Sequence, residues 1–353
     1  MCIGFWSLEH PDYALILCSN RDEFLARPTS AAHWHAFESG PSTTSSSTAT
    51  DNEDEDVEGK RVRVLSGRDL RAGGTWLGIS RDGNVAFLTN ITEPLGLYAS
   101  TRGELTSSFL LSRTSAATLD AYTSAVVQRN ASYAGFNLLL LSPSCSPSSA
   151  SPPSSSSSST SSSPPSSSPS ENRPHWQYTA SFLTNHTGGG PLTSRPLSPA
   201  TRRVGGLSNG IDGHGGETWP KVVLGSQMFA DVLESHQRER AASNNEEAET
   251  EEHLIERLFD LLTYKPPTTP LTARDTIQIP PHARQLSPLP DAALYGTRLS
   301  NVILVRRDGG VVFVERDVWM LDPHSDGKEA RAVPGERKKQ RVFRFTLEAQ
   351  GRS

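Results

Sequence analysis

The chain has 353 residues with 34 basic and 39 acidic side chains, which give a net charge of −5. This balance includes no basic stripe and therefore gives no support to a nucleic-acid partner. The three cysteines form no even disulfide framework and show no C-x-x-C spacing, which indicates a reducing compartment.

The first residues have neither the basic region nor the unbroken apolar run of a signal peptide. No stretch approaches the roughly 20 apolar residues of a membrane span. The ten histidines show no zinc-binding spacing, so we expect no metal. Together these features predict a soluble cytoplasmic protein that requires no cofactor.

Cys2 follows the initiator methionine directly, and cysteine is small enough for that methionine to be removed. Removal would leave a thiol nucleophile and a free α-amine on one residue. The amine, with an ordinary pKa near 8, can then act as the base for the thiol. A free cysteine is also a common small buried residue. Position and residue type alone leave both interpretations open.

Residues 2–8 and 13–19 are expected to form two strands, and the second is apolar on both faces, which predicts layers on both sides of it. Residues 20–23 are expected to end this strand, and residues 27–34 to form a loop. A hairpin is expected next over 79–88, then helices within 101–129 and a second hairpin formed by strands 136–141 and 177–184. A turn at 205–210 should precede helices that begin near 219 and 254. A hairpin over 301–315 and a last strand near 343–347 should complete the chain.

Three stretches are too polar to offset the entropy of ordering them, and we expect them to be disordered. They are the Ser/Thr-rich and acidic residues 38–60, the Ser/Pro-rich residues 143–170 and the charged residues 234–252. The order of the remaining elements, strands alternating with helices, favours an α+β fold in which helical layers cover antiparallel sheets.

A first candidate site combines Cys2 with Arg21, Asp22 and Glu23, which follow the apolar strand. A guanidinium favours a thiolate, and a carboxylate can hold an α-ammonium group. The same residues would also suit a solvated charge cluster at a strand end.

Asn90, Asn209 and Arg298 are further candidates. An Asn side-chain amide can donate to a developing oxyanion, but Asn also commonly caps turns. Arg298, at the entrance of the last hairpin, could clamp a carboxylate or phosphate. Gly73 and Gly74 allow a close backbone approach, for which packing against the sheet is the simpler reason.

Several short motifs together resemble the NRDE family, also called the Transport and Golgi organization protein 2 family. The resemblance extends from the start of the chain to about residue 314 outside the polar insertions. The motifs are Met1-Cys2-Ile3, Asn20-Arg21-Asp22-Glu23-Phe24, Arg27-Pro28-Thr29, Gly67-Arg68-Asp69, Gly73-Gly74-Thr75-Trp76-Leu77-Gly78, Leu88-Thr89-Asn90, Gly135-Phe136-Asn137-Leu138, Gly206-Leu207-Ser208-Asn209 and Trp219-Pro220-Lys221.

The resemblance implies a single domain over residues 1–353 with a four-layer αββα sandwich of two antiparallel sheets, similar to cysteine-type N-terminal nucleophile hydrolases. In such enzymes an N-terminal Cys attacks an amide, an Arg and an Asp tune it, and two Asn and a late Arg support the site. The matching positions here are Cys2, Arg21, either Asp22 or Glu23, Asn90, Asn209 and Arg298.

Two functions follow from the resemblance. One is hydrolysis of a small acyl amide or acyl thioester by Cys2. The other is non-catalytic carriage of haem or an acyl lipid, with haem as cargo. The resemblance also implies a role in Golgi organisation and protein secretion, with Golgi or mitochondrial association and membranes or secretory-pathway proteins as partners.

Overall fold

The computed structural model describes most of the chain outside the polar insertions. The described residues are 2–37, 63–94, 96–129, 131–147, 174–242, 247–267, 272–285, 292–325 and 330–348.

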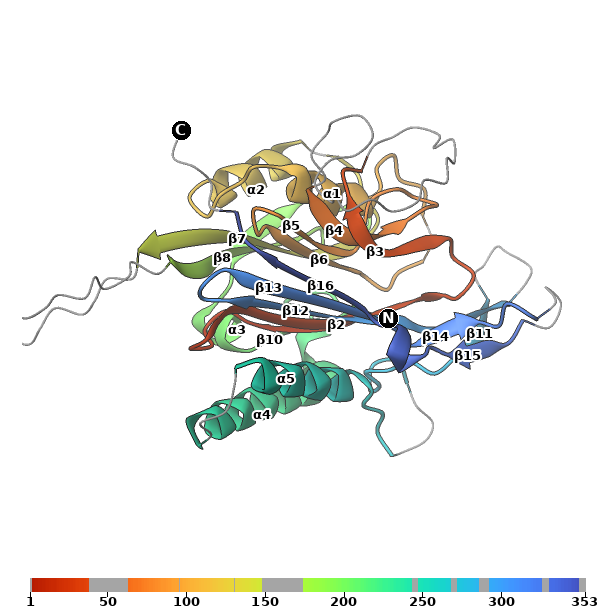
Figure 1. Cartoon of the computed structure of the whole chain (residues 1–353). Coiled ribbons are helices and arrows are strands. Elements are labelled where there is room, and N and C mark those ends of the chain that lie inside the picture. Colours follow the sequence, from red (N-terminus) through yellow and green to blue (C-terminus); the bar gives the residue numbers. More distant parts are fainter. Residues whose placement is uncertain are drawn as a thin grey trace, which may run out of the picture.

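Two seven-stranded antiparallel sheets form the centre of the molecule (Figure 1). The first has the order β10-β1-β2-β12-β13-β16, with β11 paired to β12, and the second runs from β3 to β9 in chain order. The first sheet contains β1 (Ile3–Ser7), β2 (Tyr13–Phe24), β10 (Gly205–Leu207), β11 (His282–Gln285), β12 (Ala292–Arg306), β13 (Gly310–Asp317) and β16 (Arg341–Thr346). The second contains β3 (Thr29–His35), β4 (Val64–Asp69), β5 (Leu77–Ser80), β6 (Val85–Asn90), β7 (Phe136–Pro147), β8 (Pro174–Thr184) and β9 (Thr193–Pro196).

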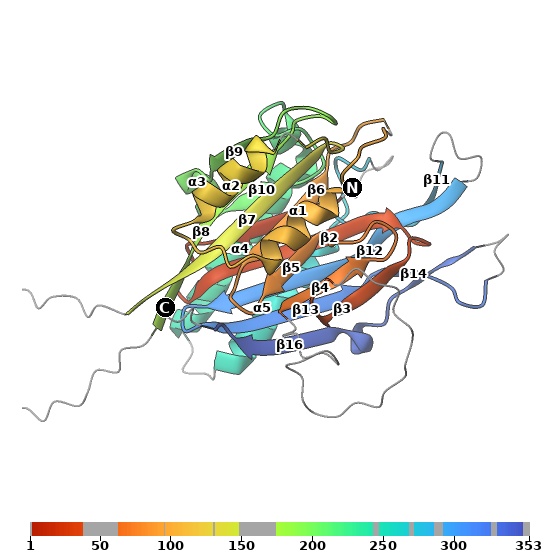
Figure 2. The ribbon, with the colours of Figure 1, turned by 90° about the horizontal axis from the view of Figure 1, so that it is seen from above.

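Helices cover the two outer faces, so the predicted αββα sandwich is confirmed (Figures 1 and 2). One helical layer packs on the second sheet and the other on the first. The helices are α1 (Arg102–Leu111), α2 (Leu119–Gln128), α3 (Pro199–Arg203), α4 (Pro220–Ala242) and α5 (Glu247–Leu262), with 3₁₀ turns η1 (Gly216–Thr218) and η2 (Arg337–Lys339); a small hairpin joins β14 (Trp319–Leu321) to β15 (Ala332–Pro334).

Strand β2 is apolar on both faces because it separates two cores, as predicted. Leu15 and Leu17 face the core between the sheets, whereas Ile16 and Cys18 face α4 and α5. Successive side chains of a strand point to opposite faces, so this alternation fixes which residues reach each layer. The hairpin predicted around Gly83 is also present, and the φ of +89° at that residue suits a glycine.

Strand β2 does not end at residue 19, which corrects one expectation. Residues 20–24 stay in the strand because they pair with β12, and Asn20 also pairs with Ile3 of β1. The buried Asn20 side chain donates to the carbonyls of Leu262 at 2.8 Å and Ile277 at 3.0 Å, so its polar group is satisfied. The charged residues 21–23 therefore lie on a rigid strand rather than in a loop.

Other polar segments are also strands rather than loops. Residues 29–35 form the edge strand β3, residues 205–207 pair with β1 as β10, and residues 143–147 extend β7, which pairs with β8. Each segment forms backbone hydrogen bonds with a neighbouring strand. A prediction from composition does not take this pairing into account. The rest of the stretch 143–170, like the stretch 38–60, lies outside the described residues.

The expected disorder of residues 234–252 is wrong wherever these residues are described. Residues 234–242 continue α4 and residues 247–252 begin α5. Their Glu, Ala and Arg residues have low apolar content but high helix propensity. A salt bridge at 2.5 Å between Arg257 and Glu239 joins the two helices, and buried Glu251 accepts from Arg344. None of the helices in the described part of the chain is both long and apolar enough to cross a membrane.

Candidate active site

A cleft opens where β1 begins and where β2 and β6 end. It has two adjoining lobes of about 280 and 260 Å³ that share Cys2, Asp22, Glu23, Asn90 and Arg102. The first lobe reaches toward α1 and the turn between β4 and β5, and the second toward β11 and β12. The N-terminal motif therefore faces one cavity formed by both sheets.

Cys2 is half-buried in this cleft and is held by its backbone. Its carbonyl accepts a hydrogen bond of 2.7 Å from the Ser208 hydroxyl, and its sulfur lies 3.8 Å from the carbonyl oxygen of Asp22. Burial raises the pKa of the Cys2 thiol, and the Asp22 carboxylate raises it further, whereas the Arg21 guanidinium opposes the rise. The thiol therefore needs a base beside it to become a nucleophile.

Arg21 lies in the cleft with 5% of its side chain exposed. Its guanidinium stacks 3.8 Å from the centre of the Trp76 ring, and its Nη2 is 3.9 Å from Glu23. Burial lowers the pKa of Arg21, with Glu23 the largest opposing charge. Glu23 also accepts a 2.9 Å hydrogen bond from the backbone N–H of Phe24, so this carboxylate is directed toward the arginines of the first lobe.

The Asp22 carboxylate points to the other face of β2 from the side chains of Arg21 and Glu23, because side chains alternate along the strand, and Asp22 still lines both lobes of the cleft. Its Oδ1 accepts a 2.5 Å hydrogen bond from the Thr297 hydroxyl, which itself accepts from the N–H of Ile279. Lys221, at the start of α4, is fully buried and interacts electrostatically with Asp22 and Cys2. Of the two acids that the sequence left open, the Asp22 carboxylate raises the pKa of the Cys2 thiol.

The two candidate asparagines lie side by side. The Asn209 side chain donates a 2.5 Å hydrogen bond to the Asn90 carbonyl, and the Asn209 carbonyl accepts from the N–H of Thr92. The Asn209 Oδ1 is buried and has no hydrogen-bond partner among the described residues. Asn90 lines both lobes and Asn209 lines the second, so both asparagines border the cleft that contains Cys2.

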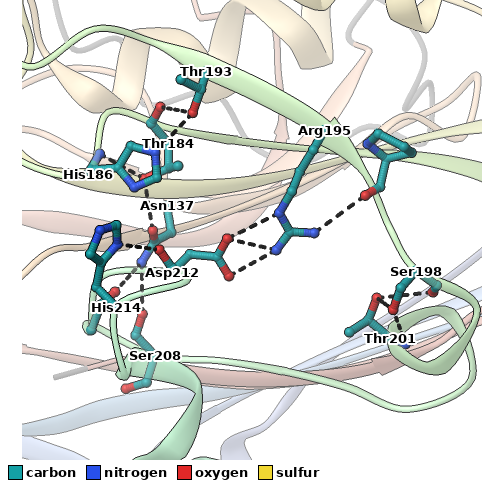
Figure 3. Close-up of polar contacts among 12 residues, drawn as sticks. Asn137, Thr184, His186, Thr193, Arg195, Ser198, Thr201, Ser208, Asp212 and His214 are labelled. Atoms are coloured by element: carbon teal, nitrogen blue, oxygen red, sulfur yellow. Dashed lines mark hydrogen bonds and ion pairs between the residues drawn. The ribbon is translucent and has the colours of Figure 1, made fainter.

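A network behind the cleft fixes the loop that carries Ser208 and Asn209. Figure 3 shows Asn137, from β7, between Thr184 and Ser208. The Asn137 Nδ2 donates to the carbonyls of Ser208 at 3.3 Å and Gly210 at 2.8 Å, and its Oδ1 accepts from Thr184 at 3.1 Å. These bonds tie the second sheet to the loop that binds the Cys2 carbonyl.

We expect Asn137→Leu to lower the free energy of unfolding by at least ~2 kcal/mol, because buried carbonyls and a hydroxyl lose their partner. Thr193→Val, on the exposed side of the same cluster (Figure 3), should change it by no more than ~0.5 kcal/mol. Urea unfolding of both variants measures the difference. Equal losses would contradict a special role for Asn137.

Arg298 does not lie at the entrance of a hairpin and does not line the cleft. It sits inside β12, at an irregularity in its pairing with β2 between Thr297 and Leu299. Its Nη1 donates a 2.5 Å hydrogen bond to the Arg27 carbonyl, and burial, with Arg21 adding to the effect, lowers its pKa to about 10. A β-bulge re-aims side chains, which places Arg298 behind the cleft.

The glycine pair Gly73–Gly74 contacts the second sheet only at its end, where the Gly74 carbonyl accepts a 3.1 Å hydrogen bond from the N–H of Asp69 in β4. A Cβ on Gly74 would lie 2.4 Å from the Gly103 carbonyl oxygen, and Gly74 has a φ of +69°. The pair therefore packs on the N-terminus of α1, and Gly73 lines the first lobe. Close backbone approach was expected here, but its partner is a helix.

Residues 1–320 match the family model described as Transport and Golgi organisation 2. The chain belongs to this family. Curated relatives include the Transport and Golgi organization protein 2 homolog of Bos taurus, 29% identical over 335 residues that cover 92% of this chain and 95% of the relative. The Homo sapiens homolog of the same name is 28% identical over 99% of this chain and its own full length.

Two solved structures of a conjugated bile acid hydrolase from Clostridium perfringens are similar in structure. Their TM-scores are 0.42 and 0.43 at 8% sequence identity, with all of both chains covered.

In this Transport and Golgi organisation 2 family member, one cleft gathers Cys2, Arg21, Asp22, Glu23 and Asn90, with Asn209 in its second lobe. Arg298 stands apart from them. The sequence interpretation assigned no role to several other residues around this site, although each lies in or beside a motif that it singled out: Trp76, Asn137, Ser208, Lys221 and Thr297. These residues are recognised as part of the site by their burial beside it, which cannot be read from the sequence alone.

Proposed function

We propose that this protein is an acyl hydrolase that uses Cys2, exposed as the N-terminal residue after removal of Met1, to cleave an amide or thioester. The observation that carries the proposal is the cleft lobe that Cys2, Asn90 and Arg21 line together. A nucleophile, an oxyanion donor and a cation within one cavity are the parts that acyl transfer needs.

The reaction would begin when the α-amine takes the thiol proton and the thiolate attacks the acyl carbonyl carbon. The Asn90 amide would donate to the resulting oxyanion, and the Asn209 Oδ1 would accept from the α-ammonium group. That ammonium would return the proton to the leaving amine or thiol as its bond to carbon breaks, leaving a thioester on Cys2. Water activated by the same amine would then release the acid and restore the thiol.

Asp22 and Arg21 would have separate tasks in this reaction. The Asp22 carboxylate, held by Thr297, would stabilise the α-ammonium group as it forms. The Arg21 guanidinium would stabilise the thiolate, which its charge favours. Arg298 would act only as a positioning residue, through the Arg27 carbonyl.

Intact-protein mass spectrometry tests this function directly. The natively expressed protein should lack Met1 and should gain one acyl group from activated acyl thioesters or amides, mapped to Cys2. Retention of Met1, or an acyl adduct elsewhere with none on Cys2, would exclude the proposed chemistry. Saturable binding of haem or an acyl lipid that is unchanged in Cys2→Ala, with no adduct, would instead support a carrier.

We further propose, from the family name, that this chain acts at membranes of the secretory pathway, with membranes or secretory-pathway proteins as partners. A fluorescent tag at the C-terminus leaves the N-terminal residue free for its chemistry. Its colocalisation with Golgi and mitochondrial markers distinguishes the two compartments. Uniform fluorescence through the cytoplasm would contradict the proposal.

A further inference from the structure

The N-terminus of α1 opens into the first lobe of the cleft. Thr101, Arg102 and Gly103 all line this lobe together with Cys2. The Thr101 side chain makes no capping hydrogen bond, although threonine commonly caps helices. The first N–H groups of a helix have no partner within it and carry the positive end of the helix dipole. The Glu104 N–H donates to the Thr101 carbonyl at 3.2 Å, so the donors that this helix start offers in the lobe beside Cys2 are the N–H groups of Arg102 and Gly103.

Arg102 brings a guanidinium group to the same place. Its Nη1 donates a 2.9 Å hydrogen bond to the Gly135 carbonyl, and within the described residues it has no carboxylate within salt-bridge distance. The Glu93 charge acts on Arg102, but Glu93 itself accepts from the N–H groups of Gly135 and Gly188. Most donors of this arginine are thus unused.

Arg21 supplies an independent observation. Its side chain is 5% exposed, and its Nη1 is buried with no hydrogen-bond partner among the described residues. A buried guanidinium donor without a partner is costly unless a ligand supplies an acceptor. Because Arg21 lines the same lobe as Arg102, an anion bound in that lobe would lie beside both guanidinium groups.

The acidic side chains of the lobe do not fill this need. Asp69 is bound by Arg27 through contacts of 2.9 and 2.7 Å. Asp22 accepts from Thr297 and interacts with the buried Lys221 on the far side of β2. Glu23 approaches the guanidinium groups only to 3.8 and 3.9 Å. None of the three carboxylates therefore accepts a hydrogen bond from Arg21 Nη1 or from Arg102 among the described residues.

We propose that Arg21, Arg102 and the N-terminus of α1 form a binding subsite for an anionic group, a carboxylate or a phosphate, next to Cys2. Helix N-termini and arginine forks suit both anions. The inference rests on the proposed function in one respect, that the anion belongs to the acyl substrate. The substrate would then be an acyl amide or thioester with a negative group near the bond that breaks.

Alkylation of Cys2 tests the subsite without any turnover. In a Cys145→Ser background, which removes the exposed thiol while Cys18 stays fully buried, mass spectrometry follows reaction with anionic iodoacetate and neutral iodoacetamide. Iodoacetate should react faster than iodoacetamide, and inorganic phosphate should slow it. Arg102→Leu should lower the iodoacetate rate by at least ~10-fold and leave the iodoacetamide rate within about twofold.

Matched variants separate charge from folding. Arg102→Lys should recover part of the iodoacetate preference, because it keeps the charge but not the fork. Arg129→Leu, which removes an exposed arginine after α2, should leave both rates unchanged. An unchanged ratio of the two rates in Arg102→Leu would overturn the subsite. Protection by phosphate but not by acetate would assign a phosphate, and the reverse would assign a carboxylate.

Melting temperatures test the subsite if Cys2 reacts with neither iodoacetate nor iodoacetamide. Inorganic phosphate or acetate should raise the melting temperature of the parent protein but not that of Arg102→Leu, and equal responses would overturn the subsite. Selective anion binding without any acyl adduct would keep the subsite and reject the hydrolase. An acyl adduct on Cys2 without selective anion binding would support the hydrolase and reject the subsite.

Discussion

Replacing Cys2 with alanine should reduce acyl hydrolysis by at least ~10³-fold and remove every acyl adduct from the N-terminal residue. The reason is that the proposed reaction passes through a thioester on this sulfur. The amide of Asn90 and the guanidinium of Arg21 would still bind substrate, so substrate affinity should change far less than turnover. Rates and adducts are measured on the same protein samples.

The other two cysteines serve as controls for this prediction. Cys145 is exposed on β7, so Cys145→Ala should keep full activity although it removes a reactive thiol. Cys18 is fully buried, and burial raises the pKa of its thiol, so it should remain unlabelled. Full activity in Cys2→Ala would reject the nucleophile, and loss of activity in Cys145→Ala would reject the location of the site.

The second large effect concerns Lys221 and should appear in the pH dependence of stability. Burial lowers the pKa of Lys221 to about 8, although Asp22 and Cys2 favour its charged form. In an unfolded chain a lysine has a pKa near 10.4. Between these values the unfolded state holds a proton that the folded state has released, so this lysine makes unfolding less favourable as the pH rises.

We therefore expect the wild type to gain about 3 kcal/mol in unfolding free energy relative to Lys221→Met between pH 7.5 and pH 10.5. Taking the difference between the two proteins cancels the titration of groups that they share. Urea unfolding across this range provides the measurement. Lys265→Met, which removes an exposed lysine after α5, should follow the wild type throughout. Parallel curves for wild type and Lys221→Met would show that burial does not lower the pKa of Lys221.

The positions of Cys2 and Lys221 show how the layers of the fold build the site. The first sheet presents Cys2 at the start of β1, and the second sheet closes the cleft with Asn90 at the end of β6. The helix layer under the first sheet adds Lys221, the only fully buried lysine among the described residues. The site thus draws one component from each of three layers, which makes it sensitive to how those layers pack.

The sequence by itself determined the features that depend on local pattern. Apolar alternation and turn residues identified the strands that carry both cores, and the N-terminal motifs identified Cys2, Arg21 and the asparagines that the cleft contains. Local pattern misjudged residues 20–24 and 234–242, because polar composition resembles a loop or a disordered segment until a neighbouring strand or helix is present.

Only the tertiary structure decided which charges act together. The register of β2 against β12 brings the Asp22 carboxylate to Thr297 and Lys221 and leaves the Arg21 and Glu23 side chains on the other face of the strand. The irregularity at Thr297 moved Arg298 behind the site. These outcomes depend on pairing between segments some 275 positions apart and on which faces become buried. No local sequence pattern encodes that pairing, because side-chain direction changes with a shift of one residue.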